Sequence, residues 1–138
     1  MGYCFCFDTN TLENTIELCY NEEKQARCVM LTKEELPECP VATTVQLIGN
    51  KWKLLIIRNL LAAPQRFTEM KKTIPGISQK VLTDNLRSLE NDGLITREVF
   101  AEVPPRVVYS LSELGNTLRP IITAMQEWGT DYKATLRD

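Results

Sequence analysis

The stretch "RFTEMKKTIPGISQKVLTDNLRSLENDG" (residues 66–93) decides the fold of this 138-residue chain. Its first part predicts a short helix that Thr68 caps and that Pro75-Gly76 ends, because this dipeptide is typical of a tight turn. Its second part predicts a longer helix between Ser78 as N-cap and Gly93 as C-cap. Two helices joined by a tight turn form a helix-turn-helix motif.

The longer helix, expected over residues 78–92, has two chemically different faces. Its apolar face consists of Leu82, Leu86 and Leu89. Its opposite face consists of Lys80, Asp84 and Arg87. A helix with this separation is buried on one side and exposed to solvent on the other.

Two further helices are expected before this motif. Pro40 suits the first position of a helix, which puts Cys39 at its N-cap, and an apolar stripe follows as far as Gly49. The segment "NKWKLLIIRNLLAAP" predicts a second helix that Asn50 caps and Pro64 ends. The expected core face of this second helix is Trp52, Leu55, Ile56, Leu60 and Leu61.

The pattern changes after the longer helix. "LITREVFAEV" (residues 94–103) alternates with a period of two, Pro104-Pro105 interrupts it, and "RVVYSL" (residues 106–111) continues in extended form, which predicts a β-hairpin with a Pro-Pro tip. In "SELGNTLRPIITAMQEWGTDYKATL" (residues 112–136) apolar residues recur every three to four positions, as in a helix. Pro120 is expected to kink or divide this last helix.

The order of these elements predicts a winged helix-turn-helix, a mainly α fold with a small β-hairpin wing (α+β). The chain is long enough for one domain with a hydrophobic core, which we expect at residues 39–138. Residues 1–38 are expected to form a separate acidic arm that contains a short strand, a helix and a second strand.

The composition argues against several classes of protein. No apolar run is long enough to span a membrane, and no secretory signal is recognisable, so we expect a cytoplasmic protein without a membrane partner. The sequence has no histidine, no phosphate-binding glycine loop and no nucleophile beside a base. We therefore expect no enzyme activity, no cofactor and no metal site.

Charge is distributed unevenly along the chain. Residues 1–38 hold three basic and eight acidic residues, whereas residues 39–138 hold thirteen basic and ten acidic ones. Between Lys51 and Arg106 ten basic residues accompany six acidic ones. This local excess fits a segment that meets phosphates, although a solvated surface accounts for it equally well.

The second helix of a helix-turn-helix lies in the major groove of DNA, with its N-terminal residues at the base edges. Its polar residues read bases, while basic residues there and in the wing contact phosphates. The candidate DNA-binding residues are Lys51, Lys53, Thr68, Ser78, Gln79, Lys80, Thr83, Arg87, Arg97 and Arg106. Two alternatives remain open, namely that these residues only form a solvated helix face, or that the winged helix binds another protein.

Three segments resemble the HxlR-type winged-helix transcription regulators, which are relatives of the MarR group. They are "CPVATTVQLIGNKWKLLIIRNLL", "RFTEMKKTIPGISQKVLTDNLRSLENDGLI" and "EVPPRVVYSLSELG" followed by "LRPIITAMQEWG". The resemblance covers about residues 38–132 and implies a DNA-binding regulator, expected to be a repressor. Its recognition helix would be residues 78–91 and its wing residues 95–111.

The resemblance also implies a homodimer that pairs mainly through its terminal helices. The stripe of the last helix alone is more typical of a core than of an interface, and the resemblance favours the interface. The expected dimerisation residues are Val41, Val45, Leu118, Ile121, Ile122, Met125 and Trp128. Two identical recognition helices require double-stranded DNA with an inverted-repeat operator.

All five cysteines lie in the first 39 residues. In many proteins of the resembled family, a single cysteine before the proline of the first helix responds to oxidants or electrophiles, and Cys39 occupies that position. The positive end of the helix dipole favours a thiolate there, whereas Glu35 and Glu38 oppose it. The alternative is a cysteine that only caps the helix.

The other four cysteines have three possible roles. Cys4, Cys6, Cys19 and Cys28 are apolar fillers, resolving partners for Cys39, or zinc ligands, but their spacing matches no standard zinc site. Met30 is an alternative start of the protein, nine residues before Cys39.

Overall fold

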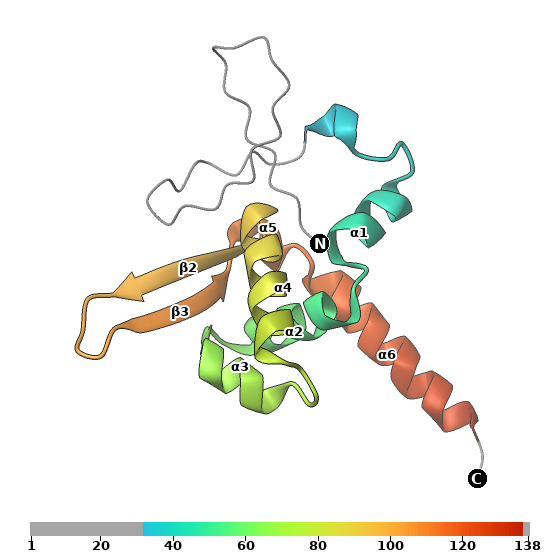
Figure 1. Cartoon of the computed structure of the whole chain (residues 1–138). Helices are drawn as coiled ribbons and strands as arrows, with labels where there is room; N and C mark the ends of the chain where they lie inside the picture. The colour runs from blue at the N-terminus through green and yellow to red at the C-terminus, as the bar shows by residue number, and fades with distance from the viewer. Residues whose placement is uncertain (1–31, 137–138) are drawn as a thin grey trace.

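The structure is a computed structural model that describes residues 32–136. After a short 3₁₀ helix, η1 (Lys33–Glu35), come α1 (Pro40–Ile48), α2 (Lys51–Ala62), β1 (Gln65–Arg66), α3 (Phe67–Thr73), α4 (Gln79–Asn91), β2 (Ile95–Phe100), β3 (Arg106–Leu111), α5 (Glu113–Asn116) and α6 (Arg119–Thr135). This order confirms the predicted winged helix-turn-helix (Figure 1). The strands and helix expected in the arm, and four of the five cysteines, lie outside the described residues.

The helix caps explain where α2 and α4 begin. The side chain of Asn50 accepts a hydrogen bond from the Trp52 amide at 2.8 Å, and the Ser78 hydroxyl accepts one from the Val81 amide at 3.1 Å. Each bond satisfies an amide that the helix itself leaves unpaired. The C-cap of α4 is Asp92 rather than the expected Gly93, which follows it with a φ of 71°, a conformation that costs glycine little.

The expected cap of the short helix is wrong. Arg66, not Thr68, is the N-cap of α3, and the Arg66 amide donates to Glu69 Oε2 at 2.6 Å. Because Arg66 also ends β1, strand and helix follow each other without a loop.

The wing belongs to a three-stranded antiparallel sheet with the strand order β1-β3-β2. β1 was not expected, because two residues are too few for a visible alternation. The first strand of the hairpin ends at Phe100 rather than at Val103, so the tip comprises residues 101–105 and includes the predicted Pro-Pro pair. The hairpin extends away from the helices (Figure 1).

The C-terminal segment is divided into two helices, α5 and α6, whereas the sequence left open whether Pro120 kinks or divides it. α5 ends at Asn116, and Pro120 is the second residue of α6, where its missing amide hydrogen costs nothing. The Arg119 guanidinium donates to the Leu61 carbonyl at 3.3 Å and so attaches the start of α6 to the end of α2.

The core lies where α2 packs against α4. The predicted apolar face of α4 is confirmed, since Leu82, Leu86 and Leu89 are all fully buried. In α2 the fully buried residues are Ile56 and Ile57, and Ile57 was missed by the predicted stripe. Because both sides of α2 are covered, a single stripe does not describe its buried surface.

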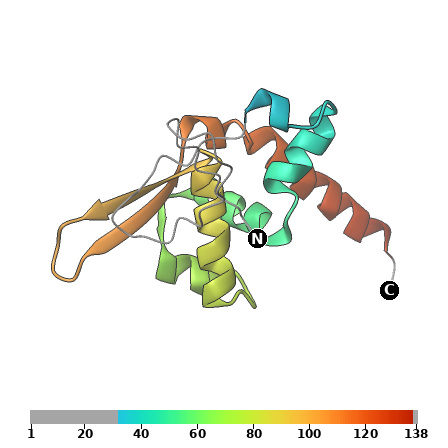
Figure 2. The same cartoon turned by 45° about the horizontal axis from the view of Figure 1, so that its top comes forward.

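α1 and α6 lie next to each other on the side of the molecule opposite the wing (Figures 1 and 2). Only the first part of α6 packs on the body of the domain, where Ile122 is buried. The remainder of α6 extends beyond the body. The two helices therefore leave a large part of their surface uncovered.

Candidate nucleic-acid interface

The solvent-facing side of α4 carries the polar residues of the predicted recognition helix. Gln79, Lys80 and Arg87 are exposed, and Lys80 forms an ion pair with Asp84 at 3.4 Å. The Lys80 and Asp84 side chains are 88% and 56% exposed, so this pair contributes little to stability and is free to exchange partners. The leucines on the opposite side hold α4 on the core, which leaves its polar side available for a groove.

Thr83 and Ser78 are partly committed to the helix itself. The Thr83 hydroxyl donates to the Gln79 carbonyl at 2.8 Å, and the Ser78 oxygen caps the helix. The Ser78 hydroxyl keeps its own proton and can donate it to a phosphate oxygen. The Thr83 hydroxyl has used its proton and keeps only accepting capacity, which suits a donor on a base edge.

Two arginines belong to the wing. Arg97 in β2 is exposed. Arg106 begins β3, where its guanidinium lies 4.2 Å from the centre of the Phe100 ring and bonds Glu102 at 3.1 Å. The Arg106 side chain is 33% exposed. Arg106 therefore both orders the wing and presents part of its charge to the solvent.

The polar and basic residues at the start of α2 and along α3 differ from one another. Lys51 is exposed, with its ammonium 4.6 Å from the centre of the Trp52 ring. Thr68 and Lys72 are exposed on α3, whereas the Lys71 ammonium bonds the Ile77 carbonyl at 3.0 Å, within the turn of the motif. Among the residues of α3, Thr68 and Lys72 are therefore free to contact DNA, whereas the Lys71 ammonium is already bonded within the motif.

Lys53 does not fit the predicted role in DNA binding. Its side chain is 12% exposed, and its ammonium donates to the Leu47 carbonyl at 3.0 Å and to Asp92 Oδ2 at 3.5 Å. Burial raises the pKa of the Asp92 carboxyl above its usual value, although the Lys53 ammonium acts in the opposite direction. Lys53 is thus a largely buried ion-pair partner rather than a phosphate contact.

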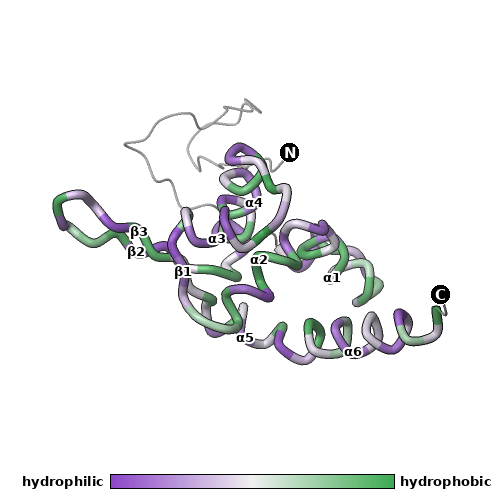
Figure 3. Tube along the Cα trace, turned by 90° about the horizontal axis from the view of Figure 1, so that it is seen from below, coloured by the Kyte–Doolittle hydropathy of each residue, from purple (hydrophilic) through white to green (hydrophobic). Residues whose placement is uncertain are grey.

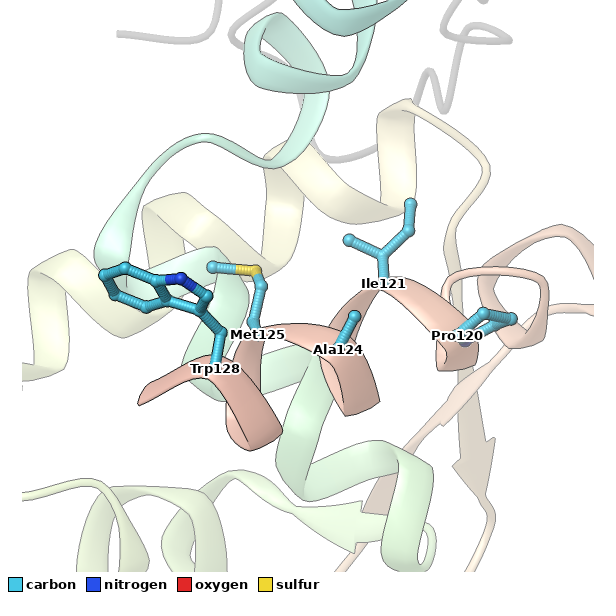
Figure 4. Close-up of a pocket in the computed structure, with 5 residues that line it drawn as sticks. All are labelled: Pro120, Ile121, Ala124, Met125 and Trp128. Atoms are coloured by element: carbon cyan, nitrogen blue, oxygen red, sulfur yellow. The ribbon is translucent and has the colours of Figure 1, made fainter. Parts of the chain in front are cut away.

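α1 and α6 share an exposed apolar surface. The exposed fractions are 71% for Val41, 60% for Val45, 49% for Met125 and 69% for Trp128. Figure 3 shows hydrophobic segments on both helices, and in Figure 4 the labelled side chains rise from one side of α6. A monomer rarely leaves so many large apolar side chains in water without a partner.

A hollow of about 270 Å³ lies between the two helices. Its lining residues are Val41, Thr44, Val45, Ile48, Gly49, Leu54, Ile121 and Met125. A second, adjoining hollow on α6 is lined by Pro120, Ile121, Ala124, Met125 and Trp128 (Figure 4). The residues that line the two hollows, together with Tyr132, are called the α1–α6 face below.

The expected dimerisation residues on α6 differ in exposure. Ile122 is only 7% exposed and belongs to the core of its own copy, whereas Leu118 is half-buried and packs against that core. Tyr132 was missing from the expected set, yet its ring stacks on Trp128 with centroids 5.2 Å apart. Its position four residues after Trp128 indicates in the sequence that both side chains lie on the same side of the helix.

Cys39 is exposed at the N-cap position of α1, directly before Pro40. Its thiol accepts no hydrogen bond from the helix amides, so the expected capping contact is absent. Cys39 is instead free and reachable from solvent, at the start of the helix that carries Val41 and Val45. Within residues 32–136 no group of three or more acidic or cysteine side chains is arranged to hold a metal ion.

The sequence matches a known family and known relatives over most of the described residues. Residues 47–136 match the family described as HxlR-like helix-turn-helix. The chain is 47% identical over 102 residues to an uncharacterised HTH-type transcriptional regulator, YdeP of Bacillus subtilis, a match that covers 74% of this chain and 80% of YdeP. Among the described residues, no helix is long and apolar enough to cross a membrane.

Two solved structures are similar in fold and sequence. The redox regulator HypR in its oxidised form is 45% identical with a TM-score of 0.65, and the match covers 72% of this chain and 99% of HypR. The reduced form of the transcriptional regulator YodB from B. subtilis is 40% identical with a TM-score of 0.59, and the match covers 67% of this chain and 91% of YodB.

Proposed function

The chain belongs to the HxlR-like helix-turn-helix family of transcriptional regulators, and from this we propose a homodimeric repressor that binds an inverted-repeat operator and responds to oxidants or electrophiles through Cys39. Its relatives are DNA-binding regulators rather than enzymes. The proposal thus concerns how this chain reads DNA, pairs with itself and is regulated.

The observation that carries DNA reading is the position of α4. α4 follows α3 through the turn at Gly76, buries its leucines and exposes Gln79, Lys80 and Arg87 on its outer side. In the major groove Gln79, at the first turn, would meet base edges, and Arg87, two turns later, would meet phosphates. The wing would then approach the DNA backbone with Arg97 and Arg106.

The α1–α6 face supports the homodimer. Covering its apolar side chains with the same face of a second copy removes them from water, and a two-fold axis makes one patch complementary to itself. The paired molecule carries two α4 helices related by that axis, which is the reason for an operator with two inverted half-sites.

The position of Cys39 supports a thiol response. Cys39 lies at the start of α1, two residues before Val41 on the α1–α6 face. A group added to its sulfur would change how α1 packs against the partner copy and thereby move the two α4 helices. HypR is described as a redox regulator, and a likeness of 45% identity makes the same type of regulation reasonable here.

DNA binding is tested with the DNA upstream of the protein's own gene. We expect a shifted band in gel electrophoresis that random DNA does not compete away, with an affinity that falls steeply as salt increases. Binding that lacks sequence preference or salt dependence would contradict the regulator proposal and favour a protein-interaction role for the winged helix.

Thiol sensing is tested with Cys39→Ser and diamide. We expect diamide to lower the operator affinity of the unmodified protein, whereas Cys39→Ser binds the same operator and does not respond. Equal responses of the two proteins would remove Cys39 from the mechanism. Variants with serine at Cys4, Cys6, Cys19 or Cys28, one at a time, serve as controls and show whether a second thiol takes part.

A further inference from the structure

Lys53 joins three helices through one ammonium group. It lies in the first turn of α2, and it contacts the Leu47 carbonyl in the last turn of α1 at 3.0 Å and the Asp92 carboxylate at 3.5 Å. Asp92 is the C-cap residue of α4. The side chains of Lys53 and Asp92 are 12% and 18% exposed, so both contacts are largely protected from water.

The electrostatics of this site explain why a cation is needed there. The C-terminal ends of α1 and α4 both carry the negative end of a helix dipole, and the Asp92 carboxylate adds a full negative charge. Burial raises the pKa of the Asp92 carboxyl, because water solvates its ionised form poorly there. The Lys53 ammonium is the basic group that neutralises both helix ends at once.

The two helices that Lys53 joins have different tasks. α1 carries part of the α1–α6 face, and α4 carries the residues that face DNA. α4 packs mainly against α2 and β2. The contacts through Lys53 are therefore a direct link between the helix at the dimer face and the helix at the DNA face.

We propose that Lys53 is a positioning residue that fixes α4 relative to α1 and thereby sets the distance between the two recognition helices of the dimer. This inference rests on the proposed dimeric DNA-binding function. It gives Lys53 a role in operator geometry although its ammonium does not reach DNA. Loss of the ammonium leaves each α4 attached to its own core but less firmly related to the partner's α4.

The test compares operators with different half-site spacing. The parent protein first selects an inverted repeat from a random pool, and duplexes with one base pair inserted or removed between the half-sites are then made. We expect the parent to lose about tenfold in affinity on either change, within the usual range for coupled sites. Lys53→Met keeps the apolar stem and removes the ammonium, and it should bind all three duplexes within about threefold of one another.

Further variants distinguish a positioning role of Lys53 from a phosphate contact and from a purely structural ion pair. Lys53→Arg keeps a cation and should restore spacing discrimination. Asp92→Asn keeps the shape of the side chain and leaves the contact between Lys53 and the Leu47 carbonyl in place. It should therefore reduce the discrimination between half-site spacings by a smaller factor than Lys53→Met does. It also tests the inference if Lys53→Met does not fold. Lys51→Met, an exposed lysine of the same helix, should weaken all duplexes equally and lower the salt slope by about one.

Three outcomes would overturn the inference that Lys53 positions α4. A uniform loss of affinity in Lys53→Met with a lower salt slope would make Lys53 a phosphate contact. A lower melting temperature with unchanged spacing discrimination in both Lys53→Met and Asp92→Asn would make it a structural ion pair only. If the parent protein selects no inverted repeat, the proposed function fails first, and the inference fails with it.

Discussion

Gln79 and Arg87 lie on the same exposed side of α4 but offer DNA different chemistry. An amide makes directional hydrogen bonds to a base edge, whereas a guanidinium two turns later meets the phosphate backbone. We therefore expect Gln79→Ala to change the preferred operator sequence, with a loss of about 1–3 kcal/mol at one base position.

Arg87→Ala is the matched variant for this comparison. It should weaken binding to all duplexes alike and reduce the slope of log K against log salt by about one. Both variants are measured by binding titrations at four or more salt concentrations, with the selected operator and a random duplex. A sequence-independent loss in Gln79→Ala would show that Gln79 does not read a base.

Asp92 predicts a pH-dependent difference in stability. Its folded-state pKa is raised by burial, so the folded state binds this proton more tightly than the unfolded state does. The stabilising contribution of Asp92 is complete below the ordinary pKa of an aspartate and is lost as the pH rises through the raised value. The asparagine in Asp92→Asn does not titrate, so this variant does not lose stability there as the pH rises. Its free energy of unfolding minus that of the parent should therefore increase with pH across that window.

Urea titrations at several pH values measure this difference, with Asp84→Asn as the control. Asp84 is exposed and pairs with Lys80 on the same helix, so its replacement should produce little change across the same window. A difference between Asp92→Asn and the parent that stays constant or decreases with pH would contradict the assigned burial.

The sequence alone does not distinguish the environments of individual charges. Lys51 and Lys53 are both basic residues at the start of α2, yet one is exposed and the other is a buried ion-pair partner. The difference arises because Asp92, 39 residues later, returns to the start of α2. Such long-range pairing is not visible in a local pattern, whereas the exposed side of α4 is predicted by its helical period.

At the scale of the elements, α5 approaches the end of α4 very closely. Gly115 is buried, and a Cβ at this position would overlap the Leu94 carbonyl oxygen, which is backbone and cannot move aside easily. The Ser112 hydroxyl donates to the Gly93 carbonyl at 2.6 Å and fixes the same approach. We expect Gly115→Ala to destabilise the fold by about 2 kcal/mol or more, as other overpacked positions do.

Gly129 in α6 is the control for this substitution. A Cβ there meets nothing within 4 Å, and alanine favours a helix over glycine. Gly129→Ala should leave stability unchanged or raise it by up to about 1 kcal/mol, measured by thermal unfolding at a fixed protein concentration. Equal effects of the two substitutions would contradict the close approach at Gly115.

The elements with strong local signals were predictable from the sequence. Asn50 and Ser78 start α2 and α4 as expected, because each cap uses its own side chain. β1 and the first residue of α3 were not predictable, since β1 exists only through its pairing with β3. Tertiary pairing, rather than local preference, defines such short strands.

At the scale of the whole molecule, the α1–α6 face predicts the oligomeric state. Met125→Glu places a carboxylate on an apolar surface, and the two-fold axis repeats it in the partner copy. The dissociation constant of the dimer should rise about a hundredfold or more, because burying unpaired carboxylates costs several kcal/mol. Sedimentation velocity over a concentration series measures this change.

Val99→Asp provides the matched control. Val99 is an apolar residue of β2 with 54% of its surface exposed, and the hairpin of β2 and β3 extends away from α1 and α6 (Figure 1). It should leave the dimer intact. A Met125→Glu protein that remains dimeric would exclude the α1–α6 face as the interface and would direct attention to other exposed apolar residues.

The apolar period of the last helix predicted α6 but not which of its residues point outward. Ile121 and Ile122 are neighbours, yet one lines the hollow between α1 and α6 and the other is buried in the core of its own copy. Resolving the two requires the position of α6 on α2, which the contact between Arg119 and Leu61 helps to fix.

The stacked pair of Trp128 and Tyr132 gives the molecule an optical reporter of its own assembly. The chain has two tryptophans, and Trp52 is half-buried whereas Trp128 is 69% exposed in a single copy. If a second copy covers the α1–α6 face, the fluorescence emission of Trp128 moves to shorter wavelength on association and returns on dilution. Trp52→Phe leaves Trp128 as the one tryptophan of the chain, so selective excitation of tryptophan follows the assembly without a label.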